Sequence, residues 1–125
     1  MTKFLMVGMG GFLGSVMRYG AGLAVLKLPC ANCSPLATLL VNATGCLLIG
    51  FLGGLAELRG FWGMEWKLFL MIGFLGGFTT FSAFGLESFE MLREGQWAMA
   101  AGNVFLQVSI GILAVWAGFL LSRLF

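Results

Sequence analysis

The stretch from Gly73 to Phe84 combines glycines, hydroxyl side chains and phenylalanines inside an uncharged apolar run. The Gly76–Gly77 pair lowers helix propensity by about 1 kcal/mol per glycine, and the hydroxyls of Thr79 and Thr80 compete for backbone hydrogen bonds. Non-helical backbone at membrane depth is tolerated only where protein or a water-filled path satisfies its polar groups. The stretch therefore predicts an ion or substrate site, with a glycine-kinked structural helix as the alternative.

The phenylalanines indicate which ion such a site would suit. Phe78, Phe81 and Phe84 recur every three residues, which is typical of lipid-facing packing, but the edge of an aromatic ring is positive and can face an anion. The run from Leu68 to Leu86 contains no carboxylate or lysine. These residue types favour a small, weakly basic anion in a narrow neutral path. Carbonyls freed at the glycine break could hold a small cation.

Two other apolar runs supply neutral amide and hydroxyl donors. Asn42 follows Thr38 by four residues and Gln107 follows Asn103 by four, so each pair shares one helix face. An unpaired amide in an apolar span costs several kcal/mol, and these side chains therefore need partners. Two roles remain open for them: donors that line a pore, and hydrogen bonds between helices.

Arg18 is a charge inside the first apolar run. Such a residue faces a partner or a water-filled cavity, or its guanidinium reaches the membrane interface. The favoured interpretation is an arginine at the mouth of an aqueous vestibule, where it raises the local anion concentration. Four charged residues follow the central stretch and are expected to emerge into solvent: Glu87, Glu90, Arg93 and Glu94.

The elements that must position these groups follow from composition. The chain has 125 residues, 60% hydrophobic and 10% charged, which predicts an integral membrane protein with one domain over residues 1–125. Its net charge of +2 gives no reason to expect nucleic acid as a partner. Four apolar runs are each long enough to cross about 30 Å of hydrocarbon. The expected fold is all-α, with four transmembrane helices near residues 4–26, 36–56, 68–91 and 97–122 and a break in the third.

Glycines at four-residue spacing predict close helix packing. The pairs are Gly10 and Gly14, Gly50 and Gly54, and Gly73 and Gly77. Cys30 and Cys33 are spaced as in metal or redox motifs, but no second cysteine pair and no histidine accompanies them, so they predict no zinc site.

The cationic residues are divided weakly between the two membrane sides. If the N-terminus is cytoplasmic, that side holds Lys3, Arg59, Lys67 and Arg123, and the other side holds Lys27 and Arg93. A bias of four against two allows insertion in both orientations, which predicts an antiparallel dimer. Four helices alone also leave little interior for a permeation path, and this favours an oligomer.

Three motifs together resemble those of the CrcB/Fluc family of fluoride channels. They are Gly10-Gly11-x-x-Gly14-Ser15-x-x-Arg18-Tyr19, Thr38-x-x-Val41-Asn42-x-x-Gly45 and Gly73-Phe74-x-Gly76-Gly77-Phe78-Thr79-Thr80-Phe81-Ser82-x-Phe84. They occur in the family's order, in a chain of the family's length. The resemblance implies a passive, fluoride-selective channel of the prokaryotic inner membrane that exports fluoride and relieves its toxicity. It also implies an antiparallel, dual-topology homodimer in the lipid bilayer with two pores.

The resemblance also implies roles for individual residues. Phe81 and Phe84 match phenylalanines whose ring edges contact fluoride. The polar groups expected in the pore are Asn42, Thr80, Ser82, Thr38, Asn103 and Gln107. Gly76 and Thr79 match positions whose backbone carbonyls, from both subunits, hold a structural sodium ion. Arg18 matches a vestibule arginine, and Glu87 matches an acidic position after the motif.

The chain departs from the family pattern at three positions. Ala83 stands where many members have threonine, and Asn103 and Gln107 stand where many have tyrosine and serine. The runner-up function is a small dual-topology, proton-coupled multidrug exporter, which would need a membrane-embedded carboxylate. A structural subunit would explain the glycines but not the convergence of donors. The sequence offers no plausible nucleophile–base pair and no metal cluster, so it does not predict an enzyme.

Overall fold

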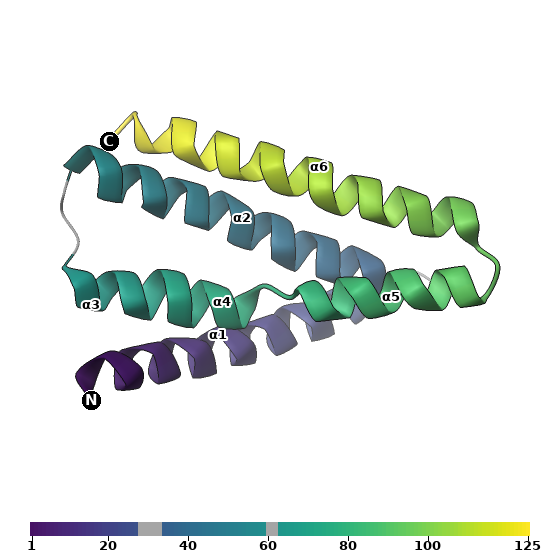
Figure 1. Cartoon of the computed structure of the whole chain (residues 1–125), viewed down its shortest axis with the longest axis horizontal. Helices are drawn as coiled ribbons and strands as arrows, with labels where there is room; N and C mark the ends of the chain where they lie inside the picture. The colour runs from purple at the N-terminus through teal and green to yellow at the C-terminus, as the bar shows by residue number, and fades with distance from the viewer. Residues whose placement is uncertain (28–33, 60–62) are drawn as a thin grey trace.

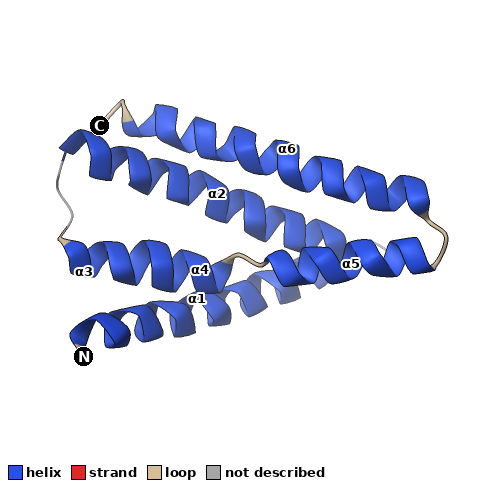
Figure 2. Cartoon of the chain, in the orientation of Figure 1, coloured by secondary structure: helices blue, strands red, loops and turns tan. Residues whose placement is uncertain are grey.

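The computed structural model describes residues 1–27, 34–59 and 63–125, and the regular structure in these ranges is helical (Figures 1 and 2). Cys30 and Cys33 lie outside the described residues. The elements are α1 (Thr2–Leu26), α2 (Ser34–Arg59), α3 (Met64–Lys67), the π-helix η1 (Leu68–Leu75), α4 (Gly76–Phe78), α5 (Phe81–Arg93) and α6 (Trp97–Ser122). The four helical segments predicted from the sequence are therefore present, and α6 has the predicted bounds.

Three helical segments are long and apolar enough to cross a membrane: Ser34–Leu58, Met64–Arg93 and Trp97–Ser122. Helix α1 has 25 residues but is not among them. Arg18 and the many glycines of α1 lower its hydropathy, so the expected membrane span over residues 4–26 stays a prediction. Both chain termini lie at the same end of the bundle, as expected for four antiparallel segments (Figure 1).

The third helical segment, from α3 to α5, has different neighbours in its first and last parts. Helix α2 packs along α6, and α1 packs along η1 and α4. Beyond α4 the chain changes neighbours, because the backbone of α5 lies close to α6 and α2 and, among the described residues, not to that of α1. The third helical segment therefore packs mainly against α1 in its first part and against α6 and α2 in its last part.

This change of neighbours occurs at two extended residues between α4 and α5 (Figure 2). Thr79 has φ −78° and ψ 157°, and Thr80 has φ −148° and ψ 119°. The Thr79 hydroxyl donates to the Leu75 carbonyl, 2.9 Å away, and Thr80 Oγ1 accepts from the Ala83 amide at 3.3 Å. Thr80 is thus the N-cap of α5, and both threonine side chains satisfy backbone groups as their position in the sequence predicted.

Glycines permit the close approach of α1 to the third segment. A side chain at Gly14 would overlap the Phe74 carbonyl oxygen, and one at Gly10 would lie 2.8 Å from the Phe74 amide nitrogen. A Cβ at Gly77 would lie 2.5 Å from the Gly11 carbonyl oxygen. Between α2 and α6, a Cβ at Gly50 would overlap the Val115 carbonyl oxygen. The predicted glycine faces are therefore confirmed as helix–helix contacts.

Gly14→Ala is expected to destabilise the bundle by about 1–3 kcal/mol, because the added methyl group can only be accommodated by moving backbone. Gly8→Ala is the matched control on the same helix, since nothing lies within 4 Å of a Cβ there. Thermal unfolding in detergent measures both variants. Equal unfolding temperatures for the two would contradict the close approach at Gly14.

Candidate functional site

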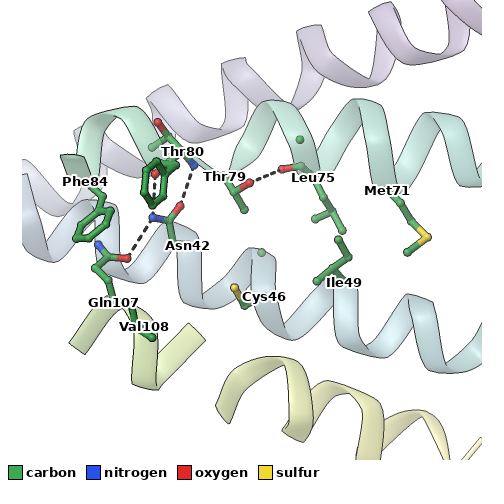
Figure 3. A pocket seen from close by; sticks show the side chains of 13 residues that line it. Asn42, Cys46, Ile49, Met71, Leu75, Thr79, Thr80, Phe84, Gln107 and Val108 are labelled. Carbon is green, nitrogen blue, oxygen red and sulfur yellow. Dashed lines mark hydrogen bonds between the residues drawn. The ribbon is translucent and has the colours of Figure 1, made fainter. Parts of the chain in front are cut away.

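A groove of about 350 Å³ lies where α2, α6 and the two extended residues meet (Figure 3). Seven of the residues predicted to form a site line it: Asn42, Gly76, Thr79, Thr80, Phe81, Phe84 and Gln107. Apolar side chains complete the wall, among them Met71, Leu75 and Ile49, together with Cys46. No pattern in the sequence indicated that these would share a cavity, because apolar residues in a span resemble one another. None of the lining residues, all within the described ranges, is charged.

Asn42 holds the extended backbone in place (Figure 3). Its Oδ1 accepts from the Thr80 amide at 2.8 Å, and its Nδ2 donates to the Thr80 carbonyl at 3.0 Å. The second Nδ2 hydrogen goes to Gln107 Oε1 at 3.2 Å. A side-chain amide has two N–H donors, so both donors of Asn42 are engaged within the protein. Of the two roles left open by the sequence, this geometry is that of a bond between segments.

Two other neutral groups at the interruption keep unused donors. Thr80 Oγ1 and Ser82 Oγ lie 3.2 Å apart, so one hydroxyl donates to the other and, within the described part of the chain, the second O–H has no acceptor. Gln107 Nε2 is buried and has no hydrogen-bond partner among the described residues. A buried donor without a partner costs about 1–3 kcal/mol, so Gln107 Nε2 is a candidate donor for a bound group.

The two phenylalanines of the groove differ in exposure. Their rings meet edge to face, with centroids 5.3 Å apart and planes at 69°. Phe84 is 9% exposed, whereas Phe81 is 81% exposed, so one side of the Phe81 ring is left uncovered by this chain. Phe78 does not join them: it is buried and stacks on Phe74 with centroids 6.1 Å apart. The predicted three-residue cluster required continuous helicity, and the extended residues remove it.

A second pocket of about 210 Å³ contains the charged groups. Arg18, Thr38 and Glu87 line it, and Thr80 lines both this pocket and the groove. Arg18 Nη1 donates to the Thr79 carbonyl at 3.3 Å. The predicted arginine therefore has both a protein partner and a cavity.

Glu87 was expected to emerge into solvent, and this expectation is wrong. Its Oε1 accepts from the hydroxyls of Ser34 and Thr38, each at 2.7 Å, and its Oε2 is buried without a partner among the described residues. The first two turns of α2 supply both donors, which the sequence could not indicate because they lie about fifty residues away along the chain. The Thr38 hydroxyl proton is consequently used by Glu87, and Thr38 belongs to the second pocket.

The carbonyls of Gly76 and Thr79 were predicted to bind a cation, and their surroundings fit that role. The Thr80 amide, the usual helical donor to the Gly76 carbonyl, bonds Asn42 instead. Among the described residues, nothing lies within 4 Å of a Cβ built on Gly76, so the Cβ side of this glycine is open. Carbonyls at a helix C-terminus carry partial negative charge. Two carbonyls do not complete the shell of a hard cation, so further oxygens would have to come from elsewhere.

Asn103 lies away from the groove. It is 9% exposed, and its Nδ2 donates to Ser88 Oγ at 3.0 Å. Ser88 in turn donates to the Phe84 carbonyl at 2.8 Å. Sequence reasoning missed Ser88, although its place four residues after Phe84 is the position from which a serine bonds back to the preceding turn.

Long apolar helices with polar groups gathered at a neutral interior groove define a multi-pass membrane protein. The chain belongs to the family described as CrcB-like protein, Camphor Resistance (CrcB), whose family model matches residues 5–119. The family membership predicted from the three motifs is thereby confirmed.

Curated bacterial relatives cover nearly the whole chain, and each is named a fluoride-specific ion channel FluC. The protein of Methylobacillus flagellatus is 40% identical over 99% of this chain and 97% of its own length. That of Caulobacter sp. is 44% identical over 98% of this chain and 96% of its own. That of Erythrobacter litoralis is 46% identical over 97% of this chain and 92% of its own.

Proposed function

We propose that this protein is a passive, fluoride-selective ion channel. The observation that carries the proposal is a groove at the helix interruption that is lined by neutral donors and two phenylalanine rings and by no charged residue. Fluoride is small and a strong hydrogen-bond acceptor, so it gains from N–H, O–H and ring-edge contacts. Conduction requires binding strong enough to replace hydration but weak enough to release the ion, and neutral donors meet both needs better than a lysine would. The names of the relatives support the same ion.

The channel is proposed to act as an antiparallel homodimer with two pores. Phe81 is 81% exposed and Gly76 is open, so the groove of one copy is incomplete. A second copy would supply the missing wall, and the weak charge bias of the chain permits the opposite orientation. The two extended residues then serve as the break in a membrane-spanning helix, held at membrane depth by Asn42.

Passive export follows from the same groove. It contains no carboxylate that could exchange protons, so fluoride that accumulates inside the cell would leave down its own gradient and toxicity would be relieved. A proton-coupled multidrug exporter is the alternative. Its carboxylate would have to be Glu87, which lines the second pocket and accepts from Ser34 and Thr38. The channel names of the relatives agree with the prediction that the protein is not an enzyme.

Anion release from liposomes tests this proposal. Purified protein is reconstituted with fluoride or chloride inside, potassium and valinomycin supply the counter-flux, and an ion-selective electrode reads the release. We expect fast fluoride release, little chloride release and no dependence on a proton gradient. Silence for fluoride, or equal release of chloride, would exclude a selective fluoride channel, and dependence on a proton gradient would favour the exporter.

A structural sodium ion is proposed to bind the Gly76 and Thr79 carbonyls of both copies. Four carbonyls from two copies would approach the coordination that two cannot complete. Arg18 already bonds one lone pair of the Thr79 oxygen, which leaves the second for the ion.

Replacing sodium with N-methyl-D-glucamine, a cation too large for such a site, is therefore expected to lower dimer stability. An ion present at about 100 times its dissociation constant stabilises the state that binds it by about 2.7 kcal/mol, and this stabilisation is lost when the ion is removed. Size-exclusion chromatography after graded heating measures the dimer fraction. The same dimer fraction in both cations would rule out a stabilising sodium site.

Arg18 is proposed to attract anions to the second pocket. Arg18→Gln is expected to slow fluoride release by about 3- to 10-fold at low ionic strength and by less at high salt, because salt screens the field. Arg18→Lys keeps the charge and is the control. A loss that is independent of salt, or equal in both variants, would indicate that Arg18 matters only for its bond to Thr79.

A further inference from the structure

A chain of two buried hydrogen bonds links α6 to the turn of α5 that carries Phe84. Asn103 on α6 donates to Ser88 Oγ, and the Ser88 hydroxyl donates to the Phe84 carbonyl. All three residues are buried, with exposures of 9% for Asn103 and Phe84 and 8% for Ser88. Bonds with this geometry fix the position of α5 on α6, since each member has its partner away from water.

The donor arrangement makes the two partners unequal. Ser88 donates to the Phe84 carbonyl one turn back on its own helix, and Asn103 takes no part in this bond. The Asn103 Nδ2, in contrast, has Ser88 Oγ as its acceptor, so removal of Ser88 leaves a buried donor unpaired. Asn103 also does not line the groove, whereas Phe84 does.

We propose that Asn103 and Ser88 form a positioning pair that sets the place of the Phe84 ring in the pore, and that Asn103 is not an anion-binding group. The proposal rests on the proposed channel function and assigns Ser88 a part in it. Asparagine at this position acts through its bond to α5, and Gln107, one turn further along α6, is the amide that reaches the groove.

A double-mutant cycle separates a positioning pair from an anion ligand. Asn103→Leu keeps the branched shape and removes the amide, and Ser88→Ala removes the acceptor. We expect S88A to lower both the dimer unfolding temperature and the fluoride release rate, the latter by about tenfold, because the Asn103 donor is orphaned. N103L alone is expected to change the rate less than about threefold, because Ser88 still bonds Phe84. The double variant S88A/N103L should recover most of the loss, since replacing both partners by apolar groups is nearly neutral.

Two controls accompany the cycle. Ser88→Thr retains the hydroxyl and should keep the wild-type release rate. Ser109→Ala is the same kind of change in a residue that lines the same outer groove of α5 and α6 as Ser88 but takes no part in the bonds to Phe84. It should leave both the rate and the stability unchanged.

The liposome assay distinguishes positioning from a general folding defect. Inactive protein lowers the fraction of liposomes that discharge, whereas a displaced Phe84 ring lowers the rate within liposomes that do discharge. We expect S88A to lower this rate. A severe loss in N103L that the double variant does not recover would show Asn103 to be an anion ligand and overturn the proposal. A change in the discharging fraction alone would overturn the positioning role.

Failure of the channel function gives a different result from failure of the pair. Wild-type protein that releases no fluoride excludes the channel and with it the role of Phe84 positioning. The unfolding temperatures of the four proteins in the cycle still report whether Asn103 and Ser88 are coupled. Additive unfolding temperatures would show that the pair does not exist in the assembled protein.

Discussion

Phe81→Ile and Phe84→Ile are each expected to lower fluoride release by about 100-fold, which corresponds to a barrier higher by about 2.7 kcal/mol. Isoleucine keeps most of the volume and the apolar character of phenylalanine but has no polarised ring edge. In a groove without charged residues, two rings and a few neutral donors must replace the hydration of the ion. Removing one such contact is comparable to removing one donor from a preorganised anion site, which costs about 10²- to 10³-fold.

The measurement is the rate of fluoride release from liposomes, with dimer formation followed by size-exclusion chromatography. Phe89→Ile is the matched control, because Phe89 is on the same helix and 59% exposed but does not line the groove. Full release by both groove variants would remove the ring edge from the mechanism. An equal loss in Phe89→Ile would assign the effect to the packing of α5.

Asn42→Ala is expected to abolish fluoride release and also to destabilise the fold. The substitution removes three hydrogen bonds, two of them to the extended backbone at Thr80 and one to Gln107. Each buried group left without a partner costs about 1–3 kcal/mol, so the freed Thr80 amide and carbonyl and the Gln107 oxygen together cost several kcal/mol. The protein is expected to recover by extending one of the flanking helices through Thr80, which would move Phe81 and Phe84 out of the groove.

Thermal unfolding and fluoride release are measured together for this variant. Thr44→Ala is the control on the same helix, since Thr44 is exposed and its hydroxyl, among the residues described, bonds only the Leu40 carbonyl of its own helix. Release that falls while the unfolding temperature stays the same would show that Asn42 binds the ion directly. Both donors of Asn42 are engaged in this structure, and that outcome would require them to be exchanged during conduction.

The neutral side chains near the groove differ in whether their hydrogen-bond donors are engaged within the protein. Asn42 donates to Thr80 and Gln107, and Thr38 donates to Glu87. Among the described residues, Gln107 Nε2 and one hydroxyl of the Thr80–Ser82 pair have no acceptor. Under the proposed channel function, a permeating anion is expected to meet the donors of Gln107 and of the Thr80–Ser82 pair, next to the backbone that Asn42 holds.

The sequence by itself determined the class of protein, the helical segments and the family. Hydrophobic run length and composition are local properties, so residues 97–122 were bounded correctly and the glycine pairs correctly marked close helix contacts. The chemistry of the central stretch was also readable, because glycines and threonines weaken a helix wherever they fall.

Only the tertiary structure decided which polar groups are paired. The partners of Asn42 lie 38 and 65 residues away along the chain, and Glu87 turns inward to hydroxyls about fifty residues before it. Asn103 and Gln107 share a helix face, yet Asn103 bonds Ser88 and Gln107 bonds Asn42. Two extended residues shift α5 from α1 to α6, and this shift separates Phe78 from Phe81 and Phe84. Helical periodicity places a side chain on one face of a helix. Whether its hydrogen-bond donors find acceptors depends on the neighbour that tertiary packing brings to that face.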